Sequence, residues 1–309
     1  MNRPIDKQQG LSLIELMIAI VISSLLMAGT IQIFVNNKQT YRVQEALSRL
    51  QENGRFAMQF LTRDIRMADF WGCAGSASKV TNRVQSADGG ITVPPIDMGT
   101  GGVNGTDNTG LNGSDSITLQ GAYGSGLSIA SHNVNDASFS LNTVNHGLVD
   151  GDLVLATDCN KADQFMITNA NSGSTVTIVG NTGVAHNNLE NSGKPALQYP
   201  EGDILKVFNY GYTIKAGASG EPALFRRINS TDQELVEGIE NMQIKYGEDT
   251  DSDGTANIYR DSGAVANMEN VVSIRITLTA RTLEDNVSLS GGRITRAFSS
   301  TITIRNRVS

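Results

Sequence analysis

Three alternating aspartates are the residues in this chain whose spacing best suits metal chemistry. Asp249, Asp251 and Asp253 are followed by Gly254. Carboxylates at the first, third and fifth positions of a loop, ahead of a glycine that makes the sharp turn, are typical of the start of a calcium loop. The twelfth position should be a bidentate glutamate but is Arg260, which disfavours an EF-hand. A calcium site of modest affinity and an acidic, solvated hairpin turn both remain open.

The chain has two cysteines, Cys73 and Cys159. In a domain outside the cytoplasm an even cysteine count predicts a disulfide, with two buried thiols as the alternative. The bond would close a loop of about 85 residues and stabilise the fold by about 4 kcal/mol. A metal site at the cysteines is not favoured, because His132, His146 and His186 have no ligand spacing to them.

Nothing else in the sequence indicates catalysis. It contains no GxSxG elbow, no HExxH pair and no GxxxxGK[ST] phosphate loop, and its three histidines are isolated. We therefore expect a protein that is not an enzyme. The formal net charge of -7 also offers no basic surface for nucleic acid, so no nucleic-acid partner is expected.

Glu15 is the one acid in an otherwise apolar N-terminal segment. The apolar run over residues 16–35 is about 20 residues long, enough to cross a hydrocarbon core of roughly 30 Å. No small-residue cleavage site follows it, so the sequence does not predict a discarded signal peptide. Placing an ionised carboxylate in lipid costs on the order of a few kcal/mol of free energy. Acids that occur in such segments usually form an ion pair with another group. An acid that reaches the headgroups is the alternative.

Helical signals continue beyond the apolar run. No proline stands between Ile5 and Val93, and beyond Asn36 apolar residues recur at steps of three and four. We predict one helix from Leu11 to Asp69, roughly 90 Å long. Its first half suits lipid or a helix bundle, and its amphipathic second half needs a partner surface. Ion pairs are expected for Glu45 with Arg49 and for Glu52 with Arg55.

The remainder is rich in turn residues and in short strand-like runs. Residues 76–114 are polar and Gly/Asn-rich, which predicts a surface excursion or a weakly structured insert. Two long alternating runs near the C-terminus predict an antiparallel pair with one face on the helix. The expected strands are 116–119, 138–141, 152–156, 164–168, 175–179, 205–214, 223–228, 242–246, 271–280 and 296–305.

The N-terminal junction resembles the cleavage site of type IV prepilins. Gly10 is followed by Leu-Ser-Leu-Ile-Glu, although that family most often has phenylalanine where this chain has Leu11. Four blocks, LQENGRFAMQFLTRDIRMADFWGC, GDLVLATDCNKADQFMIT, ELVEGIENMQIKYGEDTD and FSSTITIRNR, are similar to the PilW family of minor pilins. The resemblance implies that prepilin peptidase cuts after Gly10 and that Leu11 is then N-methylated. It also implies that Glu15 pairs with the N-terminal amine of a neighbouring subunit.

The resemblance further implies an α+β, pilin-like fold and a role in a filament. Major pilins usually carry proline where this chain has Gln32, which favours a minor pilin. Such a subunit joins other minor pilins and the major pilin, primes assembly from the inner membrane and ends at the pilus tip, with a tip adhesin as a further candidate partner. Fimbrial roles in cell adhesion and twitching motility fall within this expectation. A type II secretion pseudopilin and a membrane-anchored, calcium-dependent adhesin that never polymerises are the alternatives.

The expected organisation has four parts. Residues 1–10 form the prepilin leader, and residues 11–35 form the transmembrane and filament-core helix. Residues 36–72 continue the helix in amphipathic form. Residues 73–309 form a β-rich periplasmic head that includes the Gly/Asn-rich insert.

Overall fold

The computed structural model describes residues 12–75, 79–84, 101–133, 138–170, 173–177, 199–228, 231–285, 287–288 and 291–308. The chain divides into two compact units. The first comprises residues 1–49 and 282–294, and the second comprises residues 50–281 and 295–309. A helix with an apolar first half and a set of mainly antiparallel strands confirm the expected α+β, pilin-like class.

Helix α1 (Leu13–Met67) is 55 residues long, within two residues of the prediction at each end. It ends where Asp69 adopts a left-handed conformation with φ of 61°, and the Asp69 N–H donates to the Gln120 carbonyl over 2.8 Å. In the first unit, the predicted Glu45–Arg49 ion pair is present. Arg49 also binds Glu284 of the 282–294 segment, at 3.0 Å between Nη1 and Oε1.

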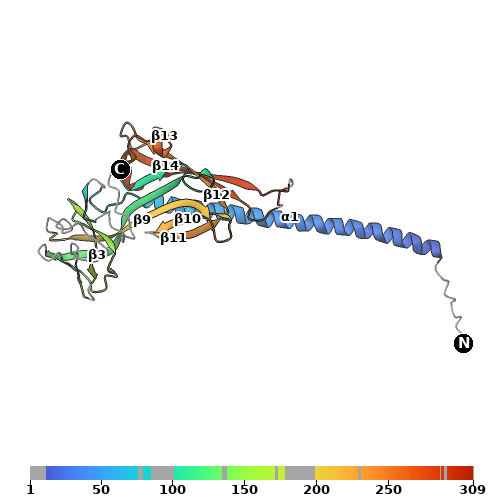
Figure 1. Cartoon of the computed structure of the whole chain (residues 1–309), viewed down its shortest axis with the longest axis horizontal. Coiled ribbons are helices and arrows are strands. Elements are labelled where there is room, and N and C mark those ends of the chain that lie inside the picture. Colours follow the sequence, from blue (N-terminus) through green and yellow to red (C-terminus); the bar gives the residue numbers. More distant parts are fainter. Residues whose placement is uncertain are drawn as a thin grey trace, which may run out of the picture. The chain divides into compact units, whose positions relative to one another are not determined.

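In the second unit, one face of α1 forms the centre of a large core. Leu50, Ala57, Leu61 and Ile65 are at most 2% exposed and pack with buried residues of the surrounding strands. Figure 1 shows this part of α1 running beside β9, β10, β12 and β14. The predicted amphipathic stripe therefore has its partner surface, supplied by the strands that follow it in sequence.

The strands form two sheets. Their bounds are β1 (Val80–Asn82), β2 (Val103–Thr106), β3 (Ser116–Asn133), β4 (Ser138–Leu141), β5 (Leu153–Thr157), β6 (Ala162–Met166), β7 (Asn169–Ala170), β8 (Thr175–Thr177), β9 (Gly202–Ala216), β10 (Pro222–Ile228), β11 (Thr231–Glu237), β12 (Ile239–Glu248), β13 (Ile258–Arg260), β14 (Val271–Arg281) and β15 (Thr295–Thr303). Four 3₁₀ helices are described: η2 (Leu111–Gly113), η3 (Ser262–Ala264), η4 (Met268–Asn270) and η5 (Arg305–Arg307). Within the described residues, one sheet has the order β13-β12-β14-β15. The other follows the path β1-β6-β5-β9-β3-β4-β8-β7, with β2 added to β3 and the β10–β11 hairpin added to β9.

The predicted antiparallel pair near the C-terminus is confirmed. Strands β14 and β15 pair with Ile274 opposite Ile302 and Leu278 opposite Phe298. Ile274 and Leu278 are fully buried, whereas Arg275 is exposed. The alternation in the sequence therefore identified the buried face correctly.

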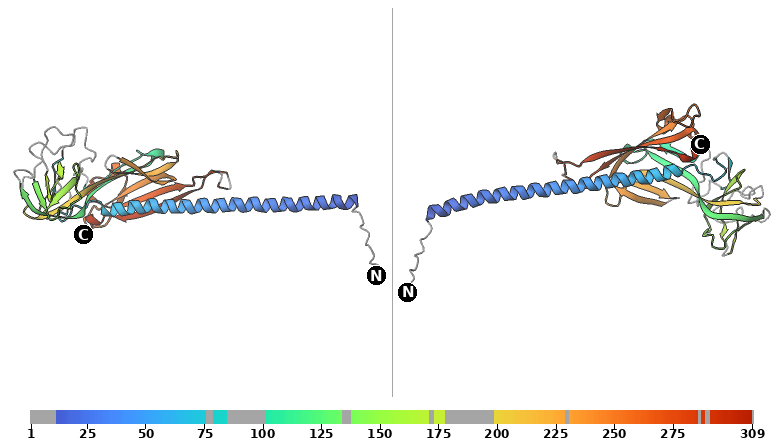
Figure 2. Two further views of the ribbon diagram at one scale, coloured as in Figure 1. Left: turned by 90° about the horizontal axis from the view of Figure 1, so that it is seen from below. Right: turned by 180° about the vertical axis from the view of Figure 1, so that it is seen from behind.

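Strands β3 and β9 are much longer than predicted because they belong to two cores. Near its start β3 contributes Ile117 to the core around α1, and beyond Gly126 it contributes Leu127 to a second cluster with Phe139 and Phe165. Figure 2 shows strand β3 in green from two further sides. The prediction that this strand ends at Leu119 is wrong, because the glycines that follow Gln120 continue the strand instead of ending it.

The expectation of a surface excursion or a weakly structured insert over residues 76–114 is also wrong in part, because two strands of this segment join the large sheet. Strand β1 pairs in parallel with β6, and β2 pairs with β3. Residues 85–100 lie outside the described part of the chain. Strand β11 was missed as well, because its sequence TDQELVE is charged and mostly exposed and lacks a clear apolar alternation.

Candidate functional site

The first turn of α1 carries Glu15, the acid singled out by the sequence. Its side chain is exposed, and none of the ion pairs formed by the described residues involves it. A carboxylate in a first turn is favoured by the helix dipole, so this position suits an unpaired acid better than a mid-helix one would. Gly10 and Leu11, the predicted processing junction, lie outside the described residues.

The helix that follows Glu15 is apolar on all sides. Every large apolar side chain from Leu13 to Val35 is between 52% and 78% exposed. An 18-residue window of α1 has a mean hydropathy of 2.3, enough by length and composition to cross a membrane. Apolar surface of this extent requires lipid or other helices as its surroundings.

The predicted disulfide is present. Cys73, just beyond the end of α1, is bonded to Cys159 in the turn between β5 and β6, with Cα atoms 4.5 Å apart. Beside it, the buried Trp71 donates from Nε1 to Asp69 Oδ1 over 2.6 Å, and Asp69 Oδ2 accepts from Arg307 Nε over 2.6 Å. The end of the helix is therefore tied both to the central strands and to the C-terminal segment.

The three candidate metal ligands do converge. Oxygen atoms of Asp249, Asp251 and Asp253 lie within 4.8 Å of one another. Asp249 accepts backbone N–H bonds from Asp251 (3.2 Å), Ser252 (2.7 Å) and Gly254 (2.8 Å). It therefore organises the turn through its own carboxylate, as turn-forming aspartates do.

The other two carboxylates also have partners inside the loop. Asp251 Oδ2 accepts from Asn257 Nδ2 over 3.2 Å, and Asp253 Oδ1 accepts from the Thr255 N–H over 2.7 Å. The loop joins β12 to β13 as a hairpin connection, as the metal-free alternative expects. Calcium binding by these aspartates stays a prediction.

Asp249 gives the loop a pH dependence. Burial raises the pKa of Asp249, but the backbone N–H bonds from Gly254, Ser252 and Asp251 outweigh burial and lower the pKa overall. A carboxyl group whose pKa falls on folding stabilises the fold above its unfolded pKa of about 3.9 and loses that contribution as the pH falls through the lower folded value. Asp249→Asn is therefore expected to lower the melting temperature at pH 7 and to flatten the acid limb of the stability profile below about pH 4.

Melting curves of the full chain between pH 2 and pH 7 measure this effect. Asp253→Asn is the matched control, because this substitution removes the same charge and, among the described residues, Asp253 accepts hydrogen bonds from Thr255 alone. Equal melting temperatures for Asp249→Asn and Asp253→Asn at pH 7 would show that Asp249 does not organise the turn.

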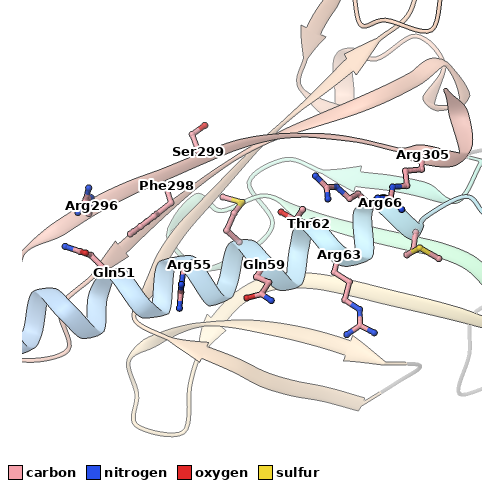
Figure 3. A pocket seen from close by; sticks show the side chains of 12 residues that line it. Gln51, Arg55, Gln59, Thr62, Arg63, Arg66, Arg296, Phe298, Ser299 and Arg305 are labelled. Atoms are coloured by element: carbon pink, nitrogen blue, oxygen red, sulfur yellow. The ribbon is translucent and has the colours of Figure 1, made fainter. Parts of the chain in front are cut away.

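An arginine-rich groove was not foreseen from the sequence. It has a volume of about 1010 Å³ and lies between α1 and β15 (Figure 3). We call it the arginine groove, and its lining residues are Gln51, Arg55, Met58, Gln59, Thr62, Arg63, Arg66, Met67, Arg296, Phe298, Ser299 and Arg305. The expected Glu52–Arg55 ion pair is not among the ion pairs of the described residues. The one sequence signal was the absence of an acid between Glu52 and Asp64 on a helix that carries Arg55 and Arg63.

Two family models match the chain. A model of the prokaryotic N-terminal methylation motif matches residues 5–31, and a model described as type IV pilus-assembly protein W, PilW, matches residues 211–306. No curated protein and no solved structure matches the chain. The first match covers Gly10, Leu11 and Glu15. The second covers β10 to β15, including the block ELVEGIENMQIKYGEDTD and all of FSSTITIRNR except its last residue, Arg307. The chain therefore carries an N-terminal methylation motif and a type IV pilus-assembly PilW domain, and together these two matches support a pilus-assembly protein of the PilW type.

Proposed function

We propose that this protein is a minor pilin that primes assembly of a type IV pilus and resides at or near its tip. The observation that carries the proposal is Glu15, which lies within the methylation motif, in the first turn of a helix whose first half is otherwise apolar and exposed. A carboxylate there needs a partner once the helix leaves water, and a neighbouring subunit's N-terminal amine provides one. Prepilin peptidase, other minor pilins and the major pilin are the expected partners.

The minor rather than major role rests on the form of the helix and on the size of the head. α1 continues as a helix through Gly29 and Gln32. Major pilins usually carry a proline at the position of Gln32, which allows local unwinding. The second unit holds 247 residues, which is large for a subunit that must repeat along a filament. We place this head in the periplasm before assembly and assign it an interaction role with no enzymatic activity.

Processing at Gly10 tests the first step of this function. Gly10→Phe is expected to block cleavage. The peptidase accepts a glycine on the leader side of the bond it cuts, and a phenylalanine ring is too large for that site. An immunoblot should then show only the full-length precursor, about ten residues longer than the mature form. The matched control is Gly29→Ala, since an added Cβ at Gly29 meets nothing within 4 Å. Normal maturation of the Gly10 variant would contradict the assignment.

Co-purification from detergent-solubilised membranes tests the second step. The wild-type protein should elute with other minor pilins, and the uncleaved Gly10→Phe protein should elute without them. Elution with secretion-system components would instead identify a type II pseudopilin. Elution of mature protein alone would favour a membrane-anchored binding protein that never polymerises.

A further inference from the structure

The arginine groove is lined by guanidinium groups and by no carboxylate. Arg55, Arg63, Arg66, Arg296 and Arg305 line it, and none of them takes part in an ion pair among the described residues. None of the lining residues is acidic. Like charges gathered in one groove repel each other, so the arrangement costs stability unless an anion from elsewhere neutralises it.

Most other arginines of the same unit form ion pairs. Arg307 pairs with Asp69 at 2.6 Å, Arg281 pairs with Glu221 at 2.8 Å, and Arg226 lies 3.5 Å from Asp64. The chain as a whole carries a net charge of -7, so acids are plentiful. The five groove arginines therefore stand out as a positive site on an acidic protein.

The groove also has an apolar floor and a definite length. Phe298 from β15 packs directly on α1, where a Cβ at Gly54 would lie 2.3 Å from the Phe298 ring. Figure 3 shows Arg66 and Arg305 together at one end and Arg296 at the other, while Arg55, Gln59 and Arg63 extend from successive turns of α1. From Gln51 to Met67 the helix rises about 24 Å, the length of about seven residues of extended chain.

One wall of the groove is a sheet edge. β15 is the last strand of its sheet and pairs only with β14 among the described strands. Most of its side chains are exposed. An edge strand of this kind presents unpaired backbone N–H and C=O groups that can receive a further strand.

We propose that the arginine groove binds an acidic segment of a partner protein, in extended conformation, as an added strand on β15. The backbone of the segment pairs with the free edge of β15. Its carboxylates, on alternate residues, face α1 and form charge-assisted bonds with the arginines. This inference goes beyond the proposed function, because it concerns the second unit and holds whether or not the chain polymerises.

A single-stranded nucleic acid is the competing anionic occupant. Such ligands bind on platforms where successive bases stack on several aromatic side chains. The groove offers one aromatic side chain, Phe298, which is too few for such stacking. A protein segment also uses the backbone edge of β15, which nucleic acid cannot.

The probe is a fluorescein-labelled octapeptide of alternating glutamate and threonine, titrated with the detergent-solubilised full chain and followed by fluorescence anisotropy. We expect saturable binding that weakens when salt rises from 50 to 300 mM. The double variant Arg63→Gln/Arg66→Gln should bind at least about tenfold more weakly. Arg227→Gln/Arg275→Gln, which removes the same charge outside the groove, should bind like the wild type. The lysine–threonine octapeptide should not bind.

Two further probes test the strand and the chemistry. Two N-methylated versions of the acidic peptide are compared, one methylated at the odd-numbered backbone nitrogens and one at the even-numbered nitrogens. The version whose methyl groups point toward β15 should not bind. Equal binding by the two N-methylated peptides and the parent would overturn strand addition. Equal weakening by both double variants, or tighter binding of an eight-nucleotide oligothymidylate than of the acidic peptide, would overturn the proposed occupant. These readouts are independent of processing and co-purification, so the proposed function can fail while this inference stands.

Discussion

Glu15→Ala is expected to leave the protein in the membrane at normal abundance and to abolish its entry into a pilus. Removing a carboxylate from an apolar helix lowers the cost of membrane insertion, by about 2.5 to 3.5 kcal/mol at the helix centre and by less in a first turn, so the anchor is retained. Filament assembly, unlike membrane insertion, becomes less favourable when the carboxylate is removed. The neighbouring subunit's amine loses its partner among apolar helices, and an unpaired buried charge costs about 3 to 5 kcal/mol.

That penalty corresponds to at least about a hundredfold loss in the association constant of the subunit. The measurement is the amount of this protein and of the major pilin in sheared filaments, together with co-purification of tagged minor pilins from membranes. Glu15→Asp keeps the charge and is expected to retain part of the assembly. In the alanine variant, this protein should be missing from sheared filaments and the tagged minor pilins should no longer co-purify with it.

Glu45→Ala is the matched control. Glu45 lies on the same helix and forms an exposed ion pair with Arg49. Exposed pairs of this type contribute little to stability because solvent screens them, so pilus number should not change. Wild-type filaments in the Glu15→Ala strain would mean that Glu15 is no more than an interfacial acid, and the protein would then be better described as a membrane-anchored binding module.

The second large effect concerns the disulfide. Replacing Cys73 and Cys159 by serine is expected to lower the free energy of unfolding by about 4 to 5 kcal/mol, because the bond closes a loop with a sequence separation of 86. For a unit of this size that loss corresponds to a melting temperature roughly 10 to 15 °C lower. Calorimetry or circular dichroism of the full chain in detergent measures the shift.

Chemical reduction of the wild-type disulfide is the matched comparison for the serine variant. Treating the wild type with a thiol should reproduce the shift, while the double serine variant should not respond. Single replacement of Cys73 or of Cys159 should destabilise as much as the double replacement, since either breaks the same bond. A thiol-induced shift below about 3 °C would show that the contacts of Trp71 and Arg307 hold the helix end without the disulfide.

The local parts of the fold were predictable because their signals are local. A helix is specified by steps of three and four and by the absence of proline, and these placed α1 within two residues at both ends. Alternation likewise located β14 and β15 and their buried face. Strands β3 and β9 were predicted too short, because glycine is a turn residue in isolation and a place of close packing in a sheet. At Gly121 an added Cβ would lie 2.9 Å from the Phe208 ring.

The candidate sites divide in the same way. The methylation motif and Glu15 are contiguous in sequence, so the sequence alone was enough to predict a processing junction and an assembly acid. The two cysteines have one possible partner each, so the sequence also predicted the disulfide that the structure contains. Only the tertiary structure decided that Asp249 organises its own turn and that Arg66 and Arg305 share one groove. A motif is a spacing along the chain, which folding preserves. A groove is a spacing between residues more than 200 positions apart, and it exists only after the core has packed the helix against the strands.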